Sequence, residues 1–270
     1  MAKSKSSSNQ SVAALLGNAQ SDGTLSPGAA ASIINITDIG EQIQQGIGID
    51  VSDVTASEVT LVTMMPDDSG SIRFVTGNTE AVREGHNLVL DALSGSKQKA
   101  SILVLCRYLN GFVLYPYAPL DQAVRMDTHN YDPSQGTPLY DQSVVLLGTV
   151  LTKAQSFEDS GVPCRTVTLI ITDGADEHSR RQTPASVRAI VRDMLQTENH
   201  IIAGMGIDDG GKTDFRRVFQ EMGIDDRWIL TPGNSPTELR RAFNVFSQSA
   251  VRASQGGASF SHAAAGGFGG

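Results

Sequence analysis

Oxygen-bearing side chains gather at three separate places in the sequence, each beside an apolar run. Asp67, Ser69 and Ser71 follow the first such run, Thr137 precedes a long apolar segment, and Asp173 follows a β-branched run. Hard cations such as Mg²⁺ prefer all-oxygen ligand sets of this kind. The sequence therefore predicts a divalent-cation site, provided that the fold brings these three places together.

The mixture of hydroxyls and carboxylates indicates what such a site would do. A cage of four carboxylates would neutralise a divalent ion, whereas neutral hydroxyls leave it electrophilic, with a coordination position open to an external carboxylate. No obvious general base accompanies the set, because Asp68 is expected to face solvent and His129 and His178 to lie at the rim. The pattern favours recognition over hydrolysis.

Apolar runs of strand type alternate with segments of helical spacing through the middle of the chain. Asn110-Gly111 between two apolar runs predicts a hairpin, and hence one antiparallel strand at an edge. The rest reads as βαβ units, which predicts an α/β fold: a doubly wound, mostly parallel sheet in a three-layer α/β/α arrangement. In such a sheet, ligands bind where loops leave the carboxyl ends of the strands. The expected strands are 58–65, 101–107, 112–117, 164–172, 200–207 and 228–231, and the expected helices 79–94, 138–155, 184–195, 214–222 and 236–254.

The composition divides the chain into four parts. Residues 1–28 are rich in Ser, Asn, Gln and Gly and are expected to be disordered. Residues 29–56 are expected to form a peripheral extension, with isoleucines at helical spacing between Ile36 and Ile47. Residues 57–254 hold the alternating elements, and the Gly-rich residues 255–270 are expected to be a flexible tail.

Charge and cysteine content exclude several classes of protein. The formal net charge of −8 argues against nucleic acid or an anionic membrane as the main partner. The chain holds 2 cysteines, Cys106 and Cys164, too few for a disulfide framework or a thiolate zinc site. No secretory signal or membrane span is visible in the sequence, so we expect a cytoplasmic protein.

The order and spacing of the oxygen-bearing residues resemble a known family. Asp67, Ser69 and Ser71 after the first strand, Thr137 before a central helix and Asp173 in an Asp-Gly after a later strand resemble the von Willebrand factor type A (vWA) domain with an intact metal-ion-dependent adhesion site (MIDAS). The resemblance covers roughly residues 57 to 253. It implies that the three hydroxyls ligate Mg²⁺ (or Mn²⁺), that the two carboxylates hold its waters, and that the metal captures an Asp or Glu of a partner protein without catalysis.

The chain lacks the secretion signal and disulfide of extracellular members. It looks more like stand-alone bacterial cytoplasmic vWA proteins of the tellurium-resistance and stress-associated type. That resemblance implies a place in a bacterial multi-protein stress or defence-type system, with an AAA+ ATPase, a kinase or a phosphatase as the partner.

Two other interpretations compete with a metal-dependent module. Gly206–Thr213 fits the phosphate-loop pattern G-x-x-x-x-G-K-[ST] between a strand and a helix, which would make the chain a nucleotide-binding protein. Against this, Asp208 and Asp209 would put negative charge into a phosphate cradle, and only 57 residues follow Thr213. The other interpretation is a purely structural subunit with a vestigial site.

Overall fold

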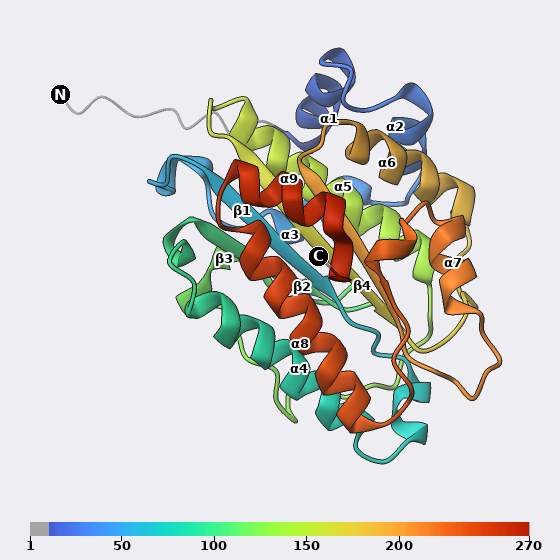
Figure 1. The fold of residues 1–270 in the computed structure, drawn as a ribbon. Helices are drawn as coiled ribbons and strands as arrows, with labels where there is room; N and C mark the ends of the chain where they lie inside the picture. The colour runs from blue at the N-terminus through green and yellow to red at the C-terminus, as the bar shows by residue number, and fades with distance from the viewer. Residues whose placement is uncertain (1–10, 270) are drawn as a thin grey trace.

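The computed structural model describes residues 11–269 and is built around one six-stranded sheet (Figure 1). The strand order is β3-β2-β1-β4-β5-β6, in which β3 is antiparallel to β2 and every other neighbouring pair is parallel. This confirms the predicted fold class and its antiparallel edge strand. The strands are β1 (Val59–Met65), β2 (Ile102–Arg107), β3 (Val113–Pro119), β4 (Cys164–Thr172), β5 (His200–Gly206) and β6 (Ile229–Leu230).

Burial on both faces explains why the central strands are apolar nearly throughout. Every residue of β1, β2 and β5 is buried, as parallel strands between helical layers require. The edge strand β3 is less buried: Tyr115 and Tyr117 are buried, Pro116 between them is exposed, and its other residues are partly exposed. The hairpin before it turns at Gly111, whose φ of 98° suits glycine.

Helices cover both faces of the sheet (Figure 1). On one face α4 and α8 pack side by side, and on the other α5 and α6 pack together, with α7 against β5 and β6. The close contact of α4 with α8 needs Gly85, because a Cβ there would lie 2.1 Å from Phe243 Cδ2. The helices of these layers are α4 (Asn78–Ser94), α5 (Leu139–Glu158), α6 (Pro184–Gln196), α7 (Phe215–Glu221) and α8 (Pro236–Ala253). Short 3₁₀ helices are η1 (Val51–Asp53), η2 (Gly70–Phe74), η3 (Lys99–Ser101), η4 (Leu120–Gln122), η5 (Asp226–Trp228) and η6 (Gly267–Gly269).

The N-terminal segment differs from the sequence prediction. We expected disorder over residues 1–28, but residues 11–28 contain α1 (Val12–Ser21) and the start of α2 (Pro27–Ile34). An apolar stripe explains this, because Leu15 and Leu16 are buried where α1 packs on α5. Residues 1–10 lie outside the described part of the chain.

The extension continues into α3 (Ile39–Ile47) and forms a further layer over α5. Two buried cations fasten it to the domain. Arg107 of β2 donates from Nη1 to the Gln42 carbonyl at 3.0 Å, and Lys153 of α5 donates from Nζ to the Ile49 carbonyl. This layer explains why α5 is apolar nearly all round, as expected for a buried helix.

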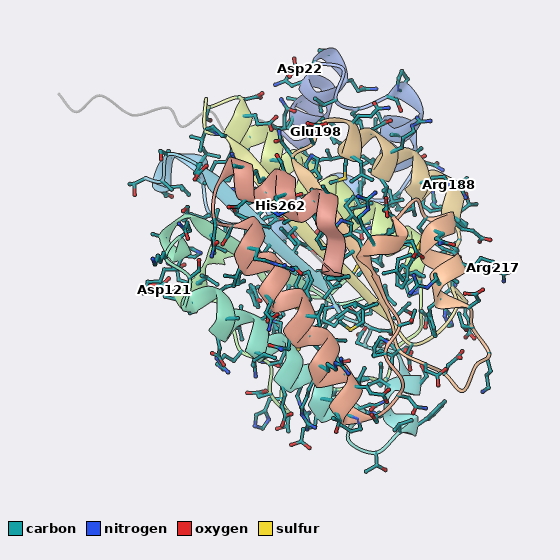
Figure 2. The ribbon with its side chains drawn as sticks, in the orientation of Figure 1. Asp22, Asp121, Arg188, Glu198, Arg217 and His262 are labelled. Carbon is teal, nitrogen blue, oxygen red and sulfur yellow. The ribbon has the colours of Figure 1, made fainter. Side chains whose placement is uncertain are left out.

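The C-terminal tail also differs from expectation. Instead of a flexible segment, the structure shows α9 (Gly257–Gly266) followed by η6, and Figure 2 labels His262 on this helix. Phe260 is buried against the domain, the Trp228 indole donates to the Ala264 carbonyl at 3.3 Å, and the Phe268 ring stacks edge-on against Trp228. These aromatic anchors offset the backbone entropy that the glycines lose on ordering.

Across residues 11–269, none of the helices combines the length and the apolar character that crossing a membrane requires.

Candidate metal centre

The predicted site residues meet at the carboxyl edge of the sheet because β1 and β4 are neighbours. Their register pairs Met65 with Ile170, so the loops that follow the two strands leave the sheet side by side. A third loop joins them from the start of α5, where the Gln135 carbonyl accepts from the Gly70 amide at 3.2 Å. The topology therefore gathers all three places that the sequence singled out.

Three oxygens form a compact triangle in this cluster. Ser69 Oγ lies 2.9 Å from Ser71 Oγ, and both hydroxyls donate to Asp173 Oδ1, at 3.1 Å and 2.8 Å respectively. In an octahedral site with Mg²⁺–oxygen distances of about 2.0–2.1 Å, neighbouring ligand oxygens lie about 2.9 Å apart. The two serine oxygens therefore have the spacing of neighbouring ligands in such a site, with the Asp173 carboxylate against both of them.

Asp67 is buried and joins two loops of the site by hydrogen bonds. One carboxylate oxygen accepts from the Ser69 amide at 2.8 Å, and the other accepts from the Thr172 hydroxyl at 2.8 Å and the Asp173 amide at 3.3 Å. The Tyr131 hydroxyl donates to the Asp67 backbone carbonyl. Asp67 thus ties the first loop to the end of β4 and fixes where the triangle forms.

Thr137 lines the same cavity as the triangle, which has a volume of about 600 Å³. Its amide donates to His178 Nδ1 at 3.0 Å, and within residues 11–269 its hydroxyl makes no hydrogen bond. That hydroxyl is the member of the predicted set left free to bind a ligand. Four of the five predicted residues thus line one cavity, and Asp67 lies buried beside them, accepting from the Ser69 and Asp173 amides.

The electrostatics of the cluster favour a cation. Burial raises the pKa of the Asp67 carboxyl above its ordinary value of 3.8, and burial with the nearby Asp67 charge raises that of Asp173 to about 6. Among the described residues no Lys, Arg or His forms a salt bridge with either carboxylate. Two buried carboxylates without a cationic partner are costly, and a divalent cation would neutralise them. The donor set therefore fits a hard cation.

Sequence reasoning placed Asp68 wrongly. It was expected to face solvent, but it is buried, with its carboxylate accepting from the Asn110 amide at 3.0 Å and its carbonyl accepting from the Ser134 and Gln135 amides. Burial raises the pKa of the Asp68 carboxyl to about 7. Asp68 thus holds the β2–β3 hairpin and the loop before Thr137 against the first loop.

The sequence also gave no role to Thr172 and Tyr131, the two side chains that hold Asp67. Thr172 had a usable signal, since it is a hydroxyl at the last position of a β-branched strand next to a candidate ligand. Tyr131 lies in a loop without periodic pattern, and nothing in the sequence pointed to it. His129 and His178 are exposed, as expected, but His178 positions the Thr137 amide.

The phosphate-loop interpretation does not fit the geometry of residues 206–213. The Asp209 carboxylate accepts from the Lys212 and Thr213 amides, at 2.9 Å and 3.0 Å, and from the Thr213 hydroxyl at 2.7 Å. Asp208 accepts from the Gly211 amide in the same way. The loop's own carboxylates thus occupy the amides that a phosphate would need.

Among residues 11–269, no group of three or more His, Cys, Asp or Glu side chains is placed to hold a metal ion. The mixed hydroxyl and carboxylate cluster is therefore the candidate that the described structure offers.

Neither the family models nor the curated proteins include a match to the sequence. Solved structures do match. A pilus adhesin, SpaC from Lactobacillus rhamnosus GG, aligns with a TM-score of 0.53 and 13% identity over 73% of this chain and 31% of the adhesin. The vWF domain of the type V pili tip protein Mfa5 from Porphyromonas gingivalis aligns with a TM-score of 0.50 and 11% identity over 75% of this chain and 98% of that domain. The likeness shows a vWA-like fold, and this chain spans about a third of the adhesin's length.

Proposed function

We propose that this chain is a non-enzymatic protein-interaction module that binds Mg²⁺ (or Mn²⁺) at a MIDAS and uses it to capture an acidic residue of a partner protein. The observation that carries the proposal is the cluster of Ser69, Ser71 and Asp173 oxygens at one cavity with the Thr137 hydroxyl, which makes no hydrogen bond to any described residue. The vWA-like fold of the pilus proteins supports it.

Each residue has a distinct part in this proposal. The hydroxyls of Ser69, Ser71 and Thr137 would bind the ion, while Asp67 and Asp173 would hold its waters and balance its charge. Bound there, Mg²⁺ would supply a Lewis-acidic point for an incoming carboxylate. Because the hydroxyls are neutral, they leave that positive charge available to the partner's Asp or Glu.

The surroundings of the site support binding rather than catalysis. His178 Nδ1 accepts from the Thr137 amide, and Asp68 is turned into the loops that it holds. Neither side chain is free to act as a general base toward a ligand in the cavity. Binding and release of the partner therefore need no proton transfer from this chain.

The identity of the partner and the setting stay predictions. The partner would be an AAA+ ATPase, a kinase or a phosphatase of a bacterial stress or defence-type system, in the cytoplasm. A pull-down with and without EDTA, followed by mass spectrometry, would identify it. Capture that chelation leaves unchanged would contradict the metal bridge.

The direct test of the metal site is calorimetric titration of the purified chain with Mg²⁺ and with Mn²⁺. Thr137→Ala removes a hydroxyl that makes no hydrogen bond in the described structure, so we expect unchanged thermal stability but metal affinity at least about tenfold weaker. Ser134→Ala removes an exposed hydroxyl from the same loop and serves as the matched control. Equal affinities of the two variants would refute the assigned role of Thr137.

A further inference from the structure

A large aromatic side chain stands exposed at the mouth of the candidate metal centre. Phe74 ends η2, three residues after Ser71, and exposes 86% of its surface while lining the same cavity. Single exposed apolar residues are common, but aromatic side chains at a binding cavity are the type that anchors protein partners. Within residues 11–269, Phe74 is the most exposed of the large apolar side chains.

The cavity is larger than one carboxylate needs. Its volume of about 600 Å³ lies in the range of sites that enclose a ligand of many atoms. It extends from the Ser69–Ser71 loop past Phe74 on one side and to the 207–213 loop on the other. A partner that reaches the metal therefore brings neighbouring side chains into the cavity with its acidic residue.

The charges around the cavity restrict those neighbours. The residues that line it include one cationic residue, Lys212, and three further acidic ones, Glu177, Asp208 and Asp209. The two carboxylates of the cluster itself already balance a divalent cation. A second acidic residue on the partner would thus meet more negative than positive charge, which disfavours acidic runs.

We propose, on the basis of the proposed function, that the partner segment carries a single Asp or Glu with an apolar side chain next to it, and that this apolar side chain packs on Phe74. The metal accepts the carboxylate, Phe74 supplies the apolar contact, and the rim carboxylates reject polyacidic segments. Phe74 is then an affinity and specificity residue that makes no contact with the metal.

The test uses fluorescein-labelled peptides that present one aspartate flanked on both sides by leucine, by glycine or by glutamate. Their binding to the full chain in Mg²⁺ is followed by fluorescence anisotropy. We expect the leucine-flanked peptide to bind about tenfold tighter than the glycine-flanked one, the change that about 60 Å² of apolar contact supports. The glutamate-flanked peptide should bind most weakly.

Variants separate Phe74 from the metal. Phe74→Ala should reduce binding of the leucine-flanked peptide to the glycine-flanked level and leave the calorimetric Mg²⁺ affinity unchanged. Ile34→Ala is the matched control, because Ile34 is also exposed, at 62%, but lies on α2 and does not line the cavity. It should change neither affinity. As Phe74 is almost fully exposed, its replacement should not affect folding.

The possible failures are distinguishable. Three results would overturn this inference: equal binding of the leucine- and glycine-flanked peptides, no binding of the leucine-flanked peptide, or no effect of Phe74→Ala. If the chain still binds Mg²⁺ in the calorimeter, the proposed function stands in each of these cases. Peptide binding that EDTA leaves intact would instead contradict the proposed function. Another possible occupant of the cavity is a second copy of this chain, which sedimentation velocity would detect. Dimerisation that depends on Mg²⁺ and is lost in Phe74→Ala would identify that occupant and overturn the inference.

Discussion

Asp173→Asn should stabilise the metal-free protein and abolish its response to Mg²⁺. Burial and the Asp67 charge raise the pKa of the Asp173 carboxyl from 3.8 to about 6. Because this pKa is higher in the folded state than in the unfolded state, the protonated Asp173 carboxyl stabilises the fold relative to the ionised one. That stabilisation is complete below pH 3.8 and is lost as the pH rises through about 6. At neutral pH the ionised carboxylate therefore costs the metal-free fold about 3 kcal/mol, since a tenfold change in proton affinity is worth about 1.4 kcal/mol.

The asparagine removes this cost but keeps the local hydrogen bonds. Its carbonyl oxygen can still accept from Ser69 and Ser71, which donate to Asp173 at 3.1 Å and 2.8 Å. Because the neutral asparagine puts no second buried charge beside Asp67, we expect a net gain of about 1–3 kcal/mol in the free energy of unfolding in EDTA. Each kcal/mol corresponds to roughly 2–4 °C in the unfolding midpoint for a chain of this size.

The assay is urea and thermal unfolding at pH 7.5 in EDTA and in excess Mg²⁺. At an Mg²⁺ concentration a thousand times its dissociation constant, the wild type should gain about 4 kcal/mol, whereas Asp173→Asn should gain almost nothing, so the order of stability reverses. The control is Asp121→Asn on η4, an exposed carboxylate labelled in Figure 2, which should change neither condition. A destabilised Asp173→Asn protein in EDTA, or one that Mg²⁺ stabilises as it does the wild type, would refute the reasoning.

Other expectations concern the fold. His86 and His200 are buried, and burial lowers the pKa of each to about 4. Protonation of each should therefore cost about 3 kcal/mol of stability as the pH falls from 6.5 to 4. Urea unfolding at several pH values should show that His86→Gln loses about 3 kcal/mol less than the wild type over this range. The same loss of stability in both proteins would contradict this. Gly85→Ala forces a Cβ against Phe243 and should destabilise by about 1–3 kcal/mol in the same assay, unlike Gly28→Ala, which meets open space. Deleting residues 1–22 removes the α1 layer from α5 and should lower the unfolding midpoint by several degrees in calorimetry, and an unchanged midpoint would show that α1 does not support the domain.

The parallel sheet was predictable because its signals are local. Continuous β-branched and apolar runs gave β1, β4 and β5, and Asn110-Gly111 gave the antiparallel edge, since each pattern depends on residues adjacent in sequence. The cap at Ser235 gave the start of α8 for the same reason.

The two ends of the chain were not predictable from composition. Ser- and Asn-rich residues around Leu15 and Leu16 suggested disorder, but what orders α1 is the surface of α5, more than a hundred residues away. Likewise α9 is ordered by contacts with Trp228, whose ring packs edge-on against Phe268 and whose indole N–H donates to the Ala264 carbonyl. Tertiary contacts of this kind outweigh weak local propensity, and no single-sequence pattern reports them.

The residues of the candidate site could be predicted from the sequence, but the hydrogen bonds that hold its loops in place could not. The spacing of Asp67, Ser69 and Ser71 after a strand, with Asp173 after the neighbouring strand, is enough to expect convergence at one sheet edge. The burial of Asp68 was missed because it depends on the Asn110 amide of a distant hairpin. Hydrogen bonds to the backbone of a distant segment cannot be predicted from the spacing of residues in the sequence.

We propose that the hydroxyls of Ser69, Ser71 and Thr137, beside Asp67 and Asp173, hold a divalent cation. The most direct measurement is electron paramagnetic resonance of Mn²⁺ titrated into the metal-free chain and its Ser71→Ala variant. We predict one bound Mn²⁺ per wild-type chain, displaced by Mg²⁺, and little binding by the variant. Absence of bound Mn²⁺, or the same binding in both proteins, would contradict the claim.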